Sequence, residues 1–121
     1  MPARRSRLVC YGHNDMLLYT RKLILGKEFV VDRCESIACL TDILSRRPLD
    51  LVLLCHSVPD AECEEIIGLV RTASPEVKVL VIRAFPPASC SQHADATMQS
   101  LTGPDALLRE VHALLGTGVL R

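Results

Sequence analysis

The chain has 121 residues, a length that suits one domain, because two hydrophobic cores in so short a chain would each be small. Its 14 basic and 14 acidic residues cancel to a formal net charge of zero, which gives no electrostatic reason to bind nucleic acid or an anionic membrane. No apolar run approaches the roughly 20 residues of a membrane span, and the N-terminus lacks the apolar middle of a signal peptide. We therefore expect one cytoplasmic domain over residues 1–121, with its core from about residue 7 to residue 116.

Cysteine is frequent in this chain, with six residues in all. None of them form a CxxC pair, and no secretion signal precedes them, so the sequence does not predict a disulfide framework. We expect most of them to be small buried hydrophobic side chains, the usual state of a free cysteine. They are Cys10, Cys34, Cys39, Cys55, Cys63 and Cys90.

Five short apolar segments are predicted to be strands. The third of them, Leu51 to Cys55, is an unbroken apolar run with Pro48 before it and Pro59 after it. Such a run is typical of a central strand that is buried on both faces of a parallel sheet. The predicted strands cover residues 8–11, 29–31, 51–55, 77–82 and 96–98.

Helical patterns follow four of these strands. Asn14 or Asp15, Ser36 and Asp60 are predicted to cap the first three helices, and Pro104 to begin the last one. The last helix is predicted to end at Gly116, and the first helix is predicted to end at Gly26 in the left-handed conformation. Residues 85–93, between the fourth and fifth strands, contain two consecutive prolines and are predicted to be irregular.

The regular alternation of strands and helices, with short connections and no repeat, predicts an α/β fold: a doubly wound five-stranded parallel sheet with helices on both faces. Folds of this class place their sites at the carboxyl edge of the sheet. Here Cys55 ends the third strand at that edge, and His56 follows it.

The segment Leu51–Pro59, LVLLCHSVP, resembles a response-regulator receiver domain of the CheY-like kind. That family has an apolar strand that ends in a phosphate-accepting aspartate, then three residues and a proline. The stretch from His93 to Leu108, HADATMQSLTGPDALL, resembles the family's last strand and last helix, and the likeness extends from about Leu8 to Leu115. It implies a flavodoxin-like sheet with strand order 2-1-3-4-5. The family usually has a fourth helix between the fourth and fifth strands, and this helix is predicted to be shortened or missing here, because only residues 85–93 fill its place.

The functional positions of the family fall on unsuitable residues in this chain. The acidic pair falls on Gly12 and His13, the phosphoacceptor on Cys55, the hydroxyl residue on Arg83 and the lysine on Ser100. Mg²⁺ prefers hard carboxylate oxygens, which glycine, imidazole and thiol do not supply. Without Mg²⁺ and the lysine, nothing offsets the charge of a transferring phosphoryl group. We therefore predict a degenerate phosphoacceptor pocket, with no enzymatic activity, cofactor or metal.

The resemblance implies a stand-alone pseudo-receiver that acts in signal transduction, in a two-component or phosphorelay setting, by phosphorylation-independent protein–protein interaction. The expected partner is a histidine kinase or another signalling protein, and a homodimer is left open. Nucleic acid and membrane are not expected as partners, since the net charge is zero.

Two other functions are left open. Cys55 could be a thiol-based sensor or nucleophile, activated by His13 or Arg83. A metal-binding regulatory domain is the other, since soft nitrogen and sulfur ligands suit zinc. Its candidate ligands are Cys90 and His93, with His13, Cys55, His56 and Cys63 near the same edge.

The environments of Arg83 and of the acidic cluster after Asp60 are also predicted. The Arg83 guanidinium either donates to backbone carbonyls or to Asp60, or it points to solvent. The acidic cluster after Asp60, which comprises Glu62, Glu64 and Glu65, is predicted to be a solvated helix face near the positive end of the helix dipole.

Overall fold

The computed structural model describes residues 6–46, 48–83, 93–99 and 103–116. The strands are β1 Arg7–Tyr11, β2 Val30–Cys34, β3 Leu51–Leu54, β4 Lys78–Arg83 and β5 Ala96–Gln99. The helices are α1 Asp15–Leu25, α2 Ile37–Arg46, α3 Asp60–Ala73 and α4 Pro104–Leu115. No helix among the described residues is both long enough and apolar enough to cross a membrane.

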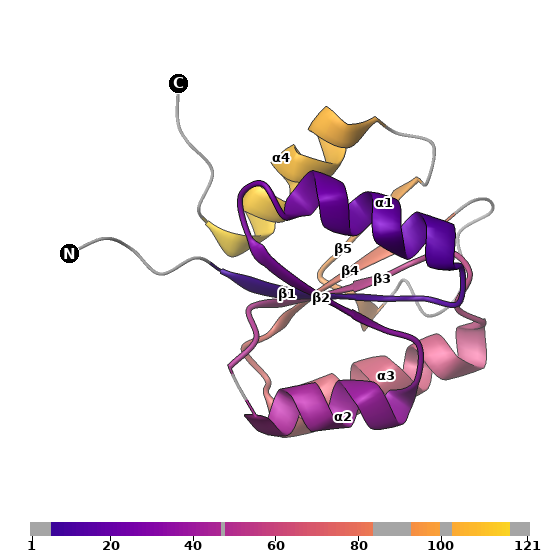
Figure 1. Ribbon diagram of the computed structural model, residues 1–121. Helices are drawn as coiled ribbons and strands as arrows, with labels where there is room; N and C mark the ends of the chain where they lie inside the picture. The colour runs from indigo at the N-terminus through magenta and orange to yellow at the C-terminus, as the bar shows by residue number, and fades with distance from the viewer. Residues whose placement is uncertain (1–5, 47, 84–92, 100–102, 117–121) are drawn as a thin grey trace.

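The five strands form one parallel sheet in the order β2-β1-β3-β4-β5. Helices α1 and α4 cover one face of the sheet, and α2 and α3 cover the other (Figure 1). The predicted fold class and strand order are therefore confirmed. The predicted shortening of a helix between β4 and β5 concerns residues 84–92, which lie outside the described residues.

The core has two apolar layers, one on each face of the sheet. Val52 and Leu54 of β3 pack with Ile66 of α3 in one layer. Leu51 and Leu53 pack with the apolar face of α1 in the other layer. All four residues of β3 are fully buried, because the strand lies between β1 and β4 and has helices on both sides.

Several predicted helix ends are confirmed. The Leu17 backbone N–H donates to Asn14 Oδ1 at 3.0 Å, so Asn14 caps α1. The Cys39 backbone N–H donates to Ser36 Oγ at 3.1 Å, so Ser36 caps α2. Pro104 begins α4, and Gly116 ends it with a φ of 68° in the left-handed region.

Two other helix ends differ from the prediction. Gly26 has a φ of −65°, in the right-handed region, and donates its N–H to the Lys22 carbonyl. A Cβ at position 26 would lie 2.6 Å from that oxygen, so the position requires glycine for close approach rather than for a positive φ. Asp60 does not cap α3: Pro59 is the N-cap, and Asp60 is the first helical residue, with its carboxylate directed to Arg83.

The expectation that the cysteines form no disulfide was wrong. Cys34 and Cys39 are joined in a disulfide, with their Cα atoms 5.7 Å apart, and Cys63 is disulfide-bonded as well. Cys34 ends β2, and Cys39 lies in the first turn of α2, so the tight β2–α2 connection brings the two sulfurs together. Of the described cysteines, Cys10 and Cys55 are free and buried, as expected of small hydrophobic side chains.

Candidate functional site

The carboxyl edge of the sheet brings Gly12 and Cys55 into contact. The Cys55 backbone N–H donates to the Tyr11 carbonyl at 2.9 Å, which continues the pairing of β1 with β3 by one residue. A Cβ added at Gly12 would lie 3.0 Å from the Cys55 Cβ and 3.1 Å from Ser57 Oγ. An acidic side chain at position 12 would therefore force its neighbours to shift.

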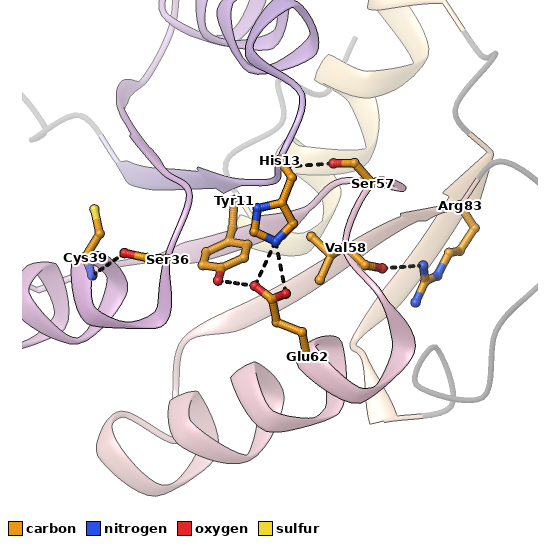
Figure 2. Close-up of polar contacts among 8 residues, drawn as sticks. All are labelled: Tyr11, His13, Ser36, Cys39, Ser57, Val58, Glu62 and Arg83. Carbon is orange, nitrogen blue, oxygen red and sulfur yellow. Dashed lines mark hydrogen bonds and ion pairs between the residues drawn. The ribbon is translucent and has the colours of Figure 1, made fainter.

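His13 joins the loop after β1 to the first turn of α3. Its Nε2 lies 2.9 Å from each carboxylate oxygen of Glu62, and its backbone N–H donates to Ser57 Oγ at 2.9 Å (Figure 2). Tyr11, the last residue of β1, donates its hydroxyl to the same Glu62 carboxylate. The Glu62 carboxylate is thus engaged by two side chains from the β1 end of the sheet.

The hydrogen bonds from Tyr11 and His13 determine the ionisation state of the Glu62 carboxylate. Burial by itself would raise the pKa of Glu62, but the hydrogen bonds from Tyr11 and His13 outweigh it, and the pKa is lowered. Burial, followed by the hydrogen bond to Glu62, raises the pKa of Tyr11. Glu62 is therefore an anion and Tyr11 a neutral donor near pH 7.

Arg83, at the end of β4, joins that strand to the start of α3. Its Nη1 donates to the Val58 carbonyl at 3.1 Å, and its Nη2 donates to Asp60 Oδ1 at 2.8 Å. The side chain is only 12% exposed. Of the two alternatives predicted for Arg83, donation to a backbone carbonyl and Asp60 is confirmed, and the solvent-directed one is wrong.

Cys55 lies beneath this polar layer and is 1% exposed. Burial raises the pKa of its thiol, and the charge and hydrogen bond of the Arg21 guanidinium oppose that rise without cancelling it. The two residues predicted to activate the thiol have other partners, since the His13 ring binds Glu62 and Arg83 binds α3. This environment favours a neutral thiol at pH 7.

The predicted metal ligands are not gathered in the part of the chain that the structure describes. No group of three or more His, Cys, Asp or Glu side chains there is arranged to hold a metal ion. Cys63 is in a disulfide, which removes its thiolate as a ligand in this state. Two predicted site residues, Ser100 and Cys90, lie outside the described residues.

Several residues of the site were not predicted from the sequence. Glu62 was expected to be solvated, yet its side chain is only 24% exposed and binds His13. Arg21 is 7% exposed on the inner face of α1, and its guanidinium Nη1 has no hydrogen-bond partner. His56, which was predicted only as a candidate metal ligand, is half-buried, and its pKa is lowered by burial first and then by the charges of Arg21 and Arg83.

Solved structures of other proteins share this arrangement of strands and helices. The signal receiver domain of an HD domain-containing protein from Pseudomonas fluorescens Pf-5 superposes with a TM-score of 0.84 over 96% of this chain and 90% of that chain, at 12% identity. The CheY-like response regulator receiver domain protein from Methanospirillum hungatei JF-1 gives 0.82 over 93% and 95%, at 18% identity. The fold is that of a receiver domain.

A third solved structure shares the fold, whereas comparisons of the sequence alone find no match. A response regulator from Thermotoga maritima also matches the receiver fold, with a TM-score of 0.82 over 93% of this chain and 99% of that chain, but at 18% identity. No protein-family model matches the chain, and no curated protein matches it in sequence. At these identities the structural likeness establishes the receiver fold alone.

Proposed function

We propose that this receiver domain is degenerate and acts in signal transduction by binding another protein without being phosphorylated. One observation carries the proposal: a buried Cys55 directly follows β3, at the position where the family resemblance places the phosphate-accepting aspartate. A thiol offers no carboxylate oxygen for an acyl phosphate and is a poor ligand for Mg²⁺.

The surroundings of Cys55 support the same proposal. Gly12 contributes no ligand, and the one described carboxylate that approaches from α3 beside His13 is that of Glu62. Its oxygens already accept hydrogen bonds from His13 and Tyr11, so Mg²⁺ would have to compete with these two contacts. No group described at this edge takes the place of the missing acidic pair.

The pairings at this edge also favour a single conformation. Arg83 holds the end of β4 to the start of α3, and His13 holds the loop after β1 to the same helical turn. The Arg83 guanidinium is a permanent positive charge that holds β4 and α3 together. A phosphoryl group and Mg²⁺ would hold the carboxyl edge only transiently. We therefore propose that the domain presents one constant surface to its partner.

The partner and setting are part of the proposal. We expect a histidine kinase or another signalling protein as partner, in the cytoplasm, and assign the domain no catalytic role. Self-association is a second form of binding to consider, since one structural neighbour is the beryllofluoride-activated NtrC4 receiver domain dimer. The zero net charge gives no support to nucleic acid or membrane as partner.

The direct test is incubation of the chain with acetyl phosphate and Mg²⁺, followed by intact-mass measurement. A receiver domain that carries the phosphate-accepting aspartate serves as positive control in the same buffer. We expect the control to gain a phosphoryl group and this chain to remain unmodified. A stable, stoichiometric phospho-adduct on this chain would contradict the proposal.

A further inference from the structure

A groove runs between α1 and β2, the edge strand of the sheet. Its volume is about 670 Å³, within the range of ligand pockets. The apolar side chains that line it are Tyr19 and Leu23 of α1, with Phe29 and Val31 at the β2 side. Tyr19 and Leu23 are 54% and 55% exposed, so two large apolar side chains of this groove face solvent.

The apolar stripe continues along α1 beyond the groove. Met16 is 73% exposed and precedes Tyr19 by three residues and Leu23 by seven. Side chains at this spacing lie on one face of a helix and span about 10 Å, which is two helical turns. An amphipathic partner helix presents its anchors at the same spacing.

All charged residues that line the groove are basic: they are Lys22, Lys27 and Arg33. None of the three takes part in an ion pair within the described ranges of the chain. Four other described arginines, by contrast, each pair with an aspartate: Arg7, Arg46, Arg71 and Arg83. The groove therefore has a local positive rim on a chain whose net charge is zero.

We propose that this groove binds an amphipathic helix of a partner protein whose apolar face is flanked by carboxylates. The apolar anchors would cover Tyr19 and Leu23, and the flanking carboxylates would pair with the lysines and with Arg33. This proposal rests on the proposed function, because it names the surface and the partner chemistry of the same protein–protein interaction. The groove is lined by none of the residues of the candidate site, such as His13, Cys55 and Arg83.

The test uses two labelled synthetic peptides with the same amphipathic helical pattern of leucines. One carries glutamates beside the leucines, and the other carries lysines at the same positions. Fluorescence anisotropy with the full chain gives the dissociation constant of each peptide at low and at physiological salt. We expect the glutamate peptide to bind at least about tenfold more tightly, with the difference shrinking as salt is added.

Variants locate the binding. Lys22→Glu reverses a charge on the rim and should weaken binding of the glutamate peptide about fivefold or more. Leu23→Ser should weaken it with the charges intact. Lys78→Glu is the matched control, because Lys78 is an exposed lysine at the start of β4 that does not line the groove, and it should leave binding unchanged.

Equal binding of both peptides, binding of neither, or an equal loss in Lys22→Glu and Lys78→Glu would overturn the proposal. So would a homodimer, measured by sedimentation, that Lys22→Glu dissociates, because the occupant would then be a second copy of this chain. The acetyl phosphate experiment is independent of these results. If the peptides do not bind and no phospho-adduct forms, only the proposal for the groove is rejected. If a phospho-adduct forms, the proposed function is rejected.

Discussion

Arg83 Nη2 lies 2.8 Å from Asp60 Oδ1 and so ties the end of β4 to the first residue of α3. Two residues further along that helix, Glu62 binds His13 from the loop after β1. The first turn of α3 is therefore held from two strands at once. If the domain is degenerate as proposed, these contacts are what keeps its carboxyl edge in one arrangement, and each of them can be tested.

Arg83→Gln should lower the free energy of unfolding by about 1–2 kcal/mol, since it removes a charge-assisted hydrogen bond and a bond to the Val58 carbonyl. The loss of stability is limited because the Asp60 side chain is 51% exposed, so water can replace the hydrogen bond from Arg83. Arg46→Gln is the matched control, because its ion pair with Asp42 is solvated and should contribute little to stability. Urea titrations that give equal losses for both variants would contradict the structural role of Arg83.

Glu62 should make stability depend on pH in the acid range. Its pKa in the folded chain is lowered from the ordinary value of 4.5, so its contribution is complete above about pH 4.5 and is lost as the pH falls through the lower folded-state value. Glu62→Gln carries no charge at any pH. The stability difference between wild type and Glu62→Gln should therefore shrink as the pH falls below about 4.5.

This comparison separates Glu62 from the second acid-sensitive group. The pKa of His56 is lowered from 6.5, mainly by burial, so its contribution is complete above about pH 6.5 and is lost at lower pH in both proteins. Subtracting the two urea titrations removes the His56 effect. A difference that stays constant as the pH falls below 4.5 would place the acid sensitivity elsewhere than at Glu62.

Cys55 should react slowly with alkylating reagents in the folded chain. It is 1% exposed, and burial raises the pKa of its thiol, so both access and the thiolate fraction are low. Mass spectrometry after iodoacetamide treatment should show Cys10 and Cys55 unmodified at pH 7 and modified in denaturant. Rapid native alkylation of Cys55 with an acidic thiol pKa would instead favour the thiol-based sensor.

Gly12→Ala should destabilise the chain by about 1–2 kcal/mol, because the new methyl would contact Cys55 and Ser57 at about 3 Å. Gly68→Ala is the control, since Gly68 is an exposed residue inside α3 with no side-chain or distant atom within 4 Å of the added Cβ. This second change should stabilise the chain by about 0.5–1 kcal/mol. If Gly12→Ala is neutral in thermal unfolding, the carboxyl edge is looser than described here.

The Cys34–Cys39 disulfide closes a small ring and should be worth about 2 kcal/mol of folding free energy, as expected for a loop of about six residues. The variant Cys39→Ser changes a half-buried side chain and should lower stability by that amount under oxidising conditions. Reduction should make the two proteins equally stable, because the bond at Cys63 is then broken in both. A difference that persists in reductant would come from packing of Cys39 and not from the disulfide.

The fold could be predicted from the sequence because its signals are local and repeated. The apolar run of β3, the caps at Asn14 and Ser36, and Pro104 at the start of α4 each specify one element. Parallel strands joined by helices then leave few arrangements open. The errors at Gly26 and Asp60 concern single residues whose close contacts depend on the folded chain.

The site was harder to predict, although part of its signal was present in the sequence. Glu62 precedes the buried Ile66 by four residues, and Arg21 lies between the buried Leu18 and Leu25 at helical spacing, so both fall on inward faces. The charge of Glu62 argued for solvent and outweighed this periodicity, and no prediction was made for Arg21. The partner of a buried charge, such as His13 for Glu62, comes from a distant part of the chain, which periodicity does not identify.

The ion pair of Arg83 also bears on how such a protein would be regulated. A guanidinium keeps its charge at every physiological pH and is not removed by a phosphatase, so the contact with Asp60 has no off state. Under the proposed function, the quantity that varies is then the amount of protein in the cell, and occupancy of its target follows mass action. Control would pass from covalent modification to synthesis and degradation of the chain.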